Sequence, residues 1–275
     1  MTPDTSLDDD YANAAYIPEG ASYPPLWEAK AAGFREGMIE AGLADLDISY
    51  GPSPRQAFDL YMPSATPKGL CVIVHGGYWL RFHRNDFSHL AAGATARGWA
   101  VAMPSYDLCP SVSIAEITRQ IAAAITQAAG MVAGPIALIG HSAGGHLVAR
   151  MTSRGLLSDA VAARLRYILP ISPVTDLRPL LRTSMNADFK MGLAEAEAES
   201  PVLVKNRLPV PVTVWVGAEE RPAFLDQARW LAEAWGVPQV VAPGRHHFDV
   251  IEPLEKADSD MLNRLLGDYS VSLYY

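Results

Sequence analysis

Gly140-His141-Ser142-Ala143-Gly144 follows the apolar run Pro135–Ile139 and precedes a segment with the composition of a helix. A serine that projects from a sharp turn between a strand and a helix requires a strained backbone, so its neighbours must be small. The flanking glycines and Ala143 meet that need. The turn also places Ser142 at the N-terminus of a helix, where free N–H groups favour developing negative charge. We therefore predict that Ser142 is a nucleophile.

Strands and helices alternate on both sides of this turn. A pair of short alternating strands precedes a series of short, uniformly apolar runs, which are typical of strands buried on both faces. The predicted strands are Asp47–Tyr50, Ala57–Met62, Leu70–Val74, Trp99–Met103, Pro135–Ile139, Tyr167–Ile171, Val210–Val216 and Gln239–Ala242. The predicted helices are Leu26–Ala41, Phe87–Arg97, Ser113–Ala129, Gly144–Arg150, Pro222–Trp235 and Glu252–Leu266. This order predicts an α/β fold, with a mostly parallel central sheet of about eight strands and helices on both faces.

The domain organisation follows from where the regular pattern begins. Residues 1–45 lack sustained periodicity apart from one helical stretch, and we interpret them as an N-terminal arm packed on the domain. Residues 46–275 then form a single α/β domain. Within it, Asp176–Lys205 is a longer, Ala- and Glu-rich excursion between two buried strands. An insertion at that point would lie over the strand ends where ligands bind, so we expect a small lid at about 176–205.

Composition excludes several classes of function. The net charge is −8, from 22 basic and 30 acidic residues, and such a surface disfavours nucleic acid and anionic lipid as partners. Two cysteines, Cys71 and Cys109, form neither a disulfide framework nor a zinc pattern, so we expect reduced thiols and no metal. No signal peptide and no apolar run of about 18 residues is visible. We expect a cytoplasmic protein without a cofactor that acts on a small molecule; a homodimer is left open.

A second loop carries the residue types that stabilise an oxyanion. His75-Gly76-Gly77-Tyr78-Trp79 directly follows the predicted strand Leu70–Val74. Glycines allow the backbone to approach a substrate, and N–H donors must point to the place where charge develops. We assign the backbone N–H groups of Gly77, Tyr78 and Ala143 to this role. We interpret His75 as a structural residue that ties the loop down.

A base and an acid are expected downstream, in the order Ser, then Asp or Glu, then His. The last predicted strand leads into His246 and His247, and only one of two adjacent side chains can face Ser142. The preceding strand, Val210–Val216, leads into Glu219 and Glu220, of which we favour Glu220. Asp176 is a further candidate for the acid, although its position also suits an N-cap of the following helix.

Together these motifs resemble a known family. His75-Gly76-Gly77-Tyr78-Trp79, Gly140-His141-Ser142-Ala143-Gly144-Gly145 and His247-Phe248-Asp249 are similar to those of kynurenine formamidase (arylformamidase) and its bacterial esterase-like relatives in the α/β-hydrolase superfamily. Ile48–Pro52 with Phe58–Tyr61, and Glu220–Phe224 with Gln227, extend the resemblance to roughly residues 45–265. It implies His247 as the base and Glu220 as the acid. The doubled His246-His247 and the paired glutamates depart from the family pattern.

The resemblance implies hydrolysis of an N-formyl arylamine such as N-formylkynurenine, through an acyl-enzyme on Ser142. Tyr78, Trp79 and Phe82 lie on or near the oxyanion loop and would form an aromatic wall for a flat ring. The alternative is a general short-chain carboxylesterase, because related esterases carry much the same motifs and a small acyl ester needs a pocket little larger than a formyl group does.

Overall fold

The protein is described by a computed structural model that covers residues 5–267. Residues 1–4 of the predicted arm and residues 268–275 of the predicted domain lie outside the described residues. All eight predicted strands are present and form one sheet. Their bounds are β1 Ala44–Ser49, β2 Ala57–Tyr61, β3 Leu70–Val74, β4 Ala100–Pro104, β5 Ile136–His141, β6 Leu165–Ile171, β7 Val214–Gly217 and β8 Gln239–Ala242.

The order of the strands in the sheet is β1-β2-β4-β3-β5-β6-β7-β8. β1 pairs with β2, and β2 with β4, in antiparallel fashion, whereas the pairs from β4 to β8 are parallel. The chain leaves β3 toward β4 but leaves β5 toward β6, so the connections diverge between these two neighbours. A crevice at the carboxyl ends of β3 and β5 is the expected binding place in such a sheet.

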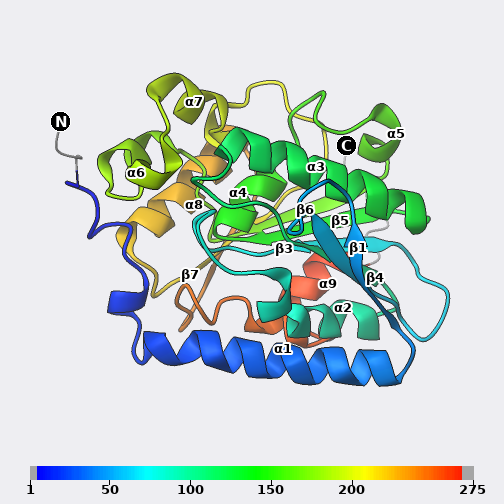
Figure 1. The fold of residues 1–275 in the computed structure, drawn as a ribbon. Helices are drawn as coiled ribbons and strands as arrows, with labels where there is room; N and C mark the ends of the chain where they lie inside the picture. The colour runs from blue at the N-terminus through cyan, green and yellow to red at the C-terminus, as the bar shows by residue number, and fades with distance from the viewer. Residues whose placement is uncertain (1–4, 268–275) are drawn as a thin grey trace.

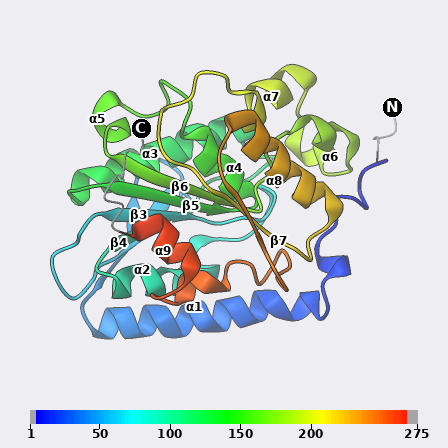
Figure 2. The ribbon, with the colours of Figure 1, turned by 180° about the vertical axis from the view of Figure 1, so that it is seen from behind.

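Helices cover both faces of the sheet, as predicted (Figures 1 and 2). Their bounds are α1 Tyr23–Glu40, α2 Ala92–Ala96, α3 Ile114–Met131, α4 Ala143–Arg150, α5 Asp159–Ala162, α6 Asn186–Phe189, α7 Leu193–Ala198, α8 Pro222–Trp235 and α9 Asp260–Leu266. One core packs α3, α4 and α8 against one face, and a second core packs α1, α2 and α9 against the other. Along β3, Val72 belongs to the first core whereas Cys71 and Ile73 belong to the second, because successive side chains of a strand point to opposite faces of the sheet.

Two predicted helices are shorter and more broken than the sequence suggested. The predicted helix 87–97 consists of the 3-10 helix η4 (Ser88–Ala91) followed by α2. The predicted helix 252–266 consists of η7 (Glu252–Glu255) and α9, with an interruption between them. α9 begins anew because Ser259 caps it: the Ser259 side chain accepts a hydrogen bond from the N–H of Leu262.

The excursion between β6 and β7 folds into short helical turns. These are η5 (Arg178–Arg182), α6, α7 and η6 (Pro201–Leu203). The described part of the N-terminal arm, from residue 5, lies beside α6 and the start of α8, and α1 then runs beneath the sheet in the layer that contains α2 and α9 (Figures 1 and 2). The start of the chain therefore lies next to elements from its second half.

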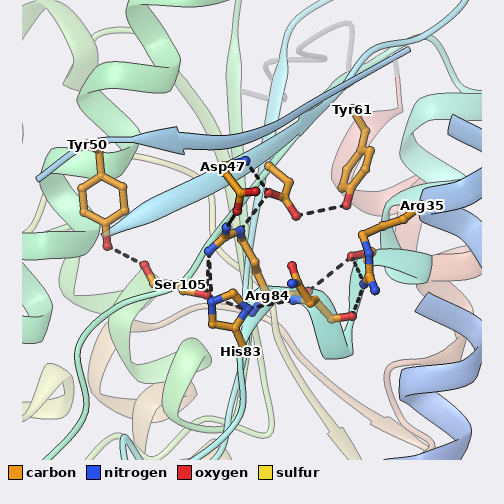
Figure 3. A network of polar contacts seen from close by, with 10 residues as sticks. Arg35, Asp47, Tyr50, Tyr61, His83, Arg84 and Ser105 are labelled. Atoms are coloured by element: carbon orange, nitrogen blue, oxygen red, sulfur yellow. Dashed lines mark hydrogen bonds and ion pairs between the residues drawn. The ribbon is translucent and has the colours of Figure 1, made fainter. Parts of the chain in front are cut away.

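A buried ion pair joins the antiparallel hairpin to the loop between β3 and β4 (Figure 3). The Nε of Arg84 lies 2.8 Å from Oδ1 of Asp59 in β2, and both side chains are 2% exposed. Arg84 also pairs with Asp47 of β1. The guanidinium of Arg35 in α1 donates to the carbonyl of Asn85, next to Arg84. The network thus fixes a loop that also carries Phe82.

Two expectations drawn from composition can be compared with the fold. Cys71 and Cys109 are free and buried. Within residues 5–267, no helix has both the length and the apolar character that a membrane crossing requires.

Candidate active site

The turn that carries Ser142 is strained and closely packed. Ser142 has φ of 55° and ψ of −116°, a conformation that side-chain-bearing residues rarely adopt. Its N–H donates to the carbonyl of Ile171 at 2.8 Å. A Cβ on Gly140 would lie 2.0 Å from the carbonyl oxygen of Gly144, and one on Gly144 would lie 2.1 Å from that of Val74. The small residues in the motif are therefore required by contact with β3 and with the turn itself.

His247 is held by Glu220. Nδ1 of His247 lies 2.6 Å from Oε2 of Glu220, and both residues are buried. The other oxygen of Glu220 accepts hydrogen bonds from the N–H of Gly217 at 2.9 Å and from the hydroxyl of Ser172. A carboxylate at Nδ1 keeps a proton on that nitrogen, so Nε2 is the nitrogen left to act as a base. Ser142 and His247 line the same cavity, whose volume is about 510 Å³.

The competing histidine has other partners. Nε2 of His246 lies 3.1 Å from the hydroxyl of Tyr23. Its Nδ1 accepts from the N–H of Phe248 at 3.2 Å, so the ring caps the turn that follows it. His246 therefore attaches α1 to the loop after β8. Its side chain does not line the cavity formed by the described residues.

The competing acids also lie elsewhere. Glu219 is exposed. Asp176 forms a two-point ion pair with Arg178, with distances of 2.9 and 2.6 Å, and also accepts from the Arg178 N–H. Glu220 is thus the carboxylate that the structure brings to His247.

The oxyanion loop presents unpaired amides. Gly77, Tyr78 and Trp79 have φ of 108°, 54° and 56°, so the backbone after β3 turns sharply. The N–H groups of Gly77, Tyr78 and Ala143 donate to no acceptor among residues 5–267. Backbone N–H groups inside proteins are nearly always paired, so an acceptor from a bound molecule or water is expected there. This is the arrangement that an oxyanion hole requires.

Close contact keeps this loop beside the nucleophile. A Cβ on Gly76 would lie 3.0 Å from Cβ of Ser142. The ring of His75 stacks on Tyr106 with centroids 4.4 Å apart, and its Nδ1 lies 2.8 Å from the carbonyl of Gly76. Burial lowers the pKa of His75 to about 3, so this ring is neutral at physiological pH. His75 thus ties the loop down and does not line the cavity.

The three aromatic residues predicted at the site take different positions. Tyr78 and Phe82 line the cavity, but Trp79 is fully buried and does not. The ring of Trp79 packs edge-on against His146, 5.0 Å away, and against Phe189, 5.7 Å away. Tyr78 and Phe82 therefore remain candidates for contact with a substrate, whereas Trp79 packs the loop onto α4 and α6.

His141 packs against His247 and also lines the cavity. Its ring centroid is 4.7 Å from that of His247. Burial and the neighbouring His247 lower the pKa of His141 well below its usual range, so this ring is also neutral. This uncharged ring packs against the ring of His247.

The N-terminal arm forms a wall of the cavity that the sequence did not reveal. Residues 6–16, here called the strap, cross the cavity and contribute much of its lining. The lining residues from the arm are Asp8, Tyr11, Ala12, Asn13, Ala14, Ala15, Gly20, Ala21, Pro24 and Trp27. Neither periodicity nor a motif marks these positions as part of a site.

Polar contacts attach the strap to both sides of the cavity. The hydroxyl of Tyr78 donates to the carbonyl of Tyr11 at 2.6 Å, and the amide of Gln227 donates to the Tyr11 hydroxyl at 2.8 Å. Arg221, next to Glu220, pairs with Asp9 at 2.8 Å. The excursion at 176–205 meets the strap where the N–H of Ser184 donates to Asp8 at 2.6 Å, and Ser184 and Met185 also line the cavity.

Comparison with known proteins identifies the family. A family model described as an alpha/beta hydrolase fold matches residues 71–235, which include the oxyanion loop, Ser142 and Glu220. The chain belongs to the alpha/beta-hydrolase family. Curated relatives of this alpha/beta hydrolase include the kynurenine formamidases of Salmo salar and Drosophila melanogaster. The first is 27% identical and the alignment covers 84% of this chain and 85% of the relative; the second is 29% identical, with 82% of each covered.

Solved structures give a consistent result. A crystal structure from Silicibacter sp. TM1040, described as a candidate thioesterase, superposes on this alpha/beta hydrolase with a TM-score of 0.94. It is 57% identical, and the match covers 95% of this chain and 99% of that one. Esterase B from Lactobacillus rhamnosis has a TM-score of 0.64 at 17% identity, covering 86% and 92%, and shares the fold. The protein is therefore a hydrolytic enzyme that resembles kynurenine formamidases, as its motifs predicted.

Proposed function

We propose that this hydrolase cleaves an N-formyl arylamine of the N-formylkynurenine kind, through an acyl-enzyme on Ser142. The observation that carries the proposal is the buried hydrogen bond between Glu220 and His247, because His247 lines one cavity together with Ser142. Nucleophile, base and acid are the three groups that acyl transfer through a serine needs.

In the proposed mechanism, Nε2 of His247 takes the proton of the Ser142 hydroxyl as its oxygen attacks the formyl carbon. Glu220 holds the proton on Nδ1 and stabilises the resulting imidazolium. The tetrahedral intermediate then collapses: the C–N bond breaks, and His247 gives its proton to the departing arylamine. Water next attacks the formyl-enzyme with His247 again as the base, and formate leaves as Ser142 regains its proton.

The unpaired amides support this sequence of steps. A negative charge develops on the carbonyl oxygen during both attacks, and the N–H groups of Gly77, Tyr78 and Ala143 are free to donate to it. They come from the loop after β3 and from the start of α4, the two connections that diverge at the switch point of the sheet.

The choice of a formyl arylamine rests on the relatives and on the walls of the cavity. The curated kynurenine formamidases align over more than four-fifths of their length. Tyr11, Trp27, Phe82 and Phe87 line the cavity with Tyr78, and aromatic walls suit a flat ring.

Ester or thioester hydrolysis is the second candidate. The observation that favours it is the 57% identical relative described as a candidate thioesterase. The same serine chemistry cleaves both bonds, since only the leaving atom differs. We would measure kcat/KM of the wild-type enzyme on N-formylkynurenine, a p-nitrophenyl ester series and an aryl thioacetate. A value for the formamide far below that for the ester or thioester would favour the second candidate.

The role of Ser142 is tested separately from the substrate. We expect Ser142→Ala to lower kcat by about 10⁴–10⁶ on every substrate and to abolish labelling by a fluorophosphonate, while the fold is kept. The matched control is Ser111→Ala, because Ser111 is exposed and does not line the cavity. Near-normal turnover by Ser142→Ala would overturn the proposed mechanism.

A further inference from the structure

Asn13 is a buried polar residue that none of the catalytic steps uses. It lies on the strap, lines the cavity, and is 8% exposed. Its carboxamide oxygen is buried and forms no hydrogen bond with any atom of residues 5–267. The side chain does not cap the short helix η1 (Ala14–Tyr16) that follows it. A buried acceptor without a donor is costly, so Asn13 is a site for a donor supplied by the contents of the cavity.

A second acceptor lies on the same strap. Asp8 also lines the cavity and is half-buried. One of its oxygens accepts from the N–H of Ser184 at 2.6 Å, which fixes the carboxylate beside the excursion. Asp8 forms no ion pair with a cation of the described chain. A carboxylate that a neighbouring amide orients but no cation neutralises favours a positively charged ligand.

The remaining charge in the lining has the opposite sign and comes from another element. Arg81 belongs to the loop after Trp79 and is exposed. The strap thus contributes two acceptors, the carboxamide oxygen of Asn13 and the carboxylate of Asp8, while the loop contributes the guanidinium of Arg81 as a donor. This asymmetry gives the cavity a direction for a ligand that carries a donor at one end.

We propose that Asn13 and Asp8 form a recognition subsite for an amino group on the leaving part of the substrate, so that the strap sets specificity. The inference rests on the proposed function for the position of the scissile bond. Neither residue takes part in the chemistry: both act on binding, through hydrogen bonds to an N–H donor and, for Asp8, through charge.

The experiment compares two substrates that differ only in the amino group. These are N-formylkynurenine and its deamino analogue, in which hydrogen replaces that group. We expect the wild-type enzyme to prefer the first by about 10- to 100-fold in kcat/KM, as a charge-assisted hydrogen bond permits. Asn13→Ala and Asp8→Asn should each remove most of this preference, chiefly through KM, because kcat/KM falls much more on N-formylkynurenine than on the deamino analogue. Asn in place of Asp8 retains an acceptor for Ser184.

The matched control is Asn206→Ala, because Asn206 is exposed and accepts a hydrogen bond from Arg154, and neither residue lines the cavity. It should keep the wild-type preference. An equal loss on both substrates in Asn13→Ala and Asp8→Asn, or an unchanged preference in both, would overturn the proposed subsite.

A second measurement separates this inference from the proposed function. If the wild-type enzyme cleaves neither formamide, the proposed function fails, but the subsite is tested by inhibition of p-nitrophenyl acetate hydrolysis. In the wild type, kynurenine should then inhibit at least tenfold more strongly than its deamino analogue. In Asn13→Ala, the two compounds should inhibit equally. Equal inhibition by the two compounds in the wild type would refute the subsite.

Discussion

Glu220 and His247 are separated by 27 positions in the chain, yet they form a buried hydrogen bond of 2.6 Å between Oε2 and Nδ1. Glu220 follows β7 and His247 follows β8, and these strands are parallel neighbours. Because parallel strands end at the same edge of the sheet, both side chains are brought to the carboxyl edge near Ser142.

We expect Glu220→Gln to lower kcat by about 10³–10⁴ without loss of the fold. The amide oxygen of Gln would still accept from Gly217, which turns the NH₂ group toward His247. The ring would then carry its proton on Nε2 and could not act as a base. Steady-state kinetics and thermal unfolding measure the two effects. Glu219→Gln is the matched control and should behave as wild type. A loss of kcat in Glu219→Gln with a normal kcat in Glu220→Gln would show that Glu219 is the acid that holds His247.

Gly144→Ala should destabilise the protein by about 3 kcal/mol and lower activity. The added Cβ would lie 2.1 Å from the carbonyl oxygen of Val74 and 2.6 Å from that of His75, so β3 and the oxyanion loop must shift. Gly33→Ala is the control, because no atom lies within 4 Å of a Cβ at that position of α1. It should stabilise by about 0.5–1 kcal/mol. Equal urea midpoints for the two variants would contradict this expectation.

Asp59→Ala leaves the buried Arg84 without its buried partner, with the exposed Asp47 as the remaining carboxylate in its ion pairs, and should cost up to about 3–5 kcal/mol in the free energy of unfolding. Arg84 lies on the loop that carries Phe82, a residue of the cavity lining. We therefore also expect the variant protein that remains folded to have a higher KM than the wild type. Urea unfolding and kinetics on one substrate measure both. Asp226→Ala removes a pair whose side chains are about half exposed and should cost under about 1 kcal/mol. A similar cost for both variants would show that the Arg84 pair contributes no more than a surface pair.

His146 should make the protein less stable in acid. Burial lowers its pKa to about 4, and its Nε2 donates to the carbonyl of Glu199 at 2.7 Å. Below pH about 6.5 the unfolded chain binds a proton that the folded state does not. The contribution of neutral His146 is therefore fully present above pH 6.5 and is lost as the pH falls toward about 4, by up to about 1.4 kcal/mol per pH unit.

His146→Gln tests this assignment, since the amide of Gln can still donate to Glu199. The free energy of unfolding should fall less steeply with acid than in the wild type between pH 6.5 and 4. Between pH 7 and 8 the two proteins should differ by a constant offset. Parallel curves over the acid range would show that His146 does not account for any of the acid sensitivity.

Local features of the sequence predicted the sheet and the position of the nucleophile. The strands from β3 onward are each encoded by an apolar run, β1 and β2 by alternating residues, and the turn that carries Ser142 by five consecutive residues. The choice between His246 and His247 was not local in this way. It depends on which ring meets Glu220 and which meets Tyr23, a residue from the far end of the chain.

Two parts of the candidate site could not be predicted for physical reasons. The strap lacks periodicity because its contacts are made with residues such as Arg182, Arg221 and Gln227, which are remote in sequence. Tyr78 and Trp79 are adjacent and both have positive φ, and the fold of the loop directs Tyr78 into the cavity and Trp79 into the core. Neither property is encoded by residue type.

The contacts of the strap have a consequence for biosynthesis. A ribosome releases residues 6–16 long before it reaches Arg221 and Gln227, so the strap lacks these two anchors during most of translation. A chain that stops at the end of β7 lacks both the acid of the proposed triad, Glu220, and the anchors Arg221 and Gln227 of the cavity wall. Turnover would consequently begin only once nearly the whole polypeptide has emerged, which makes enzymatic activity a direct report that synthesis and folding are complete.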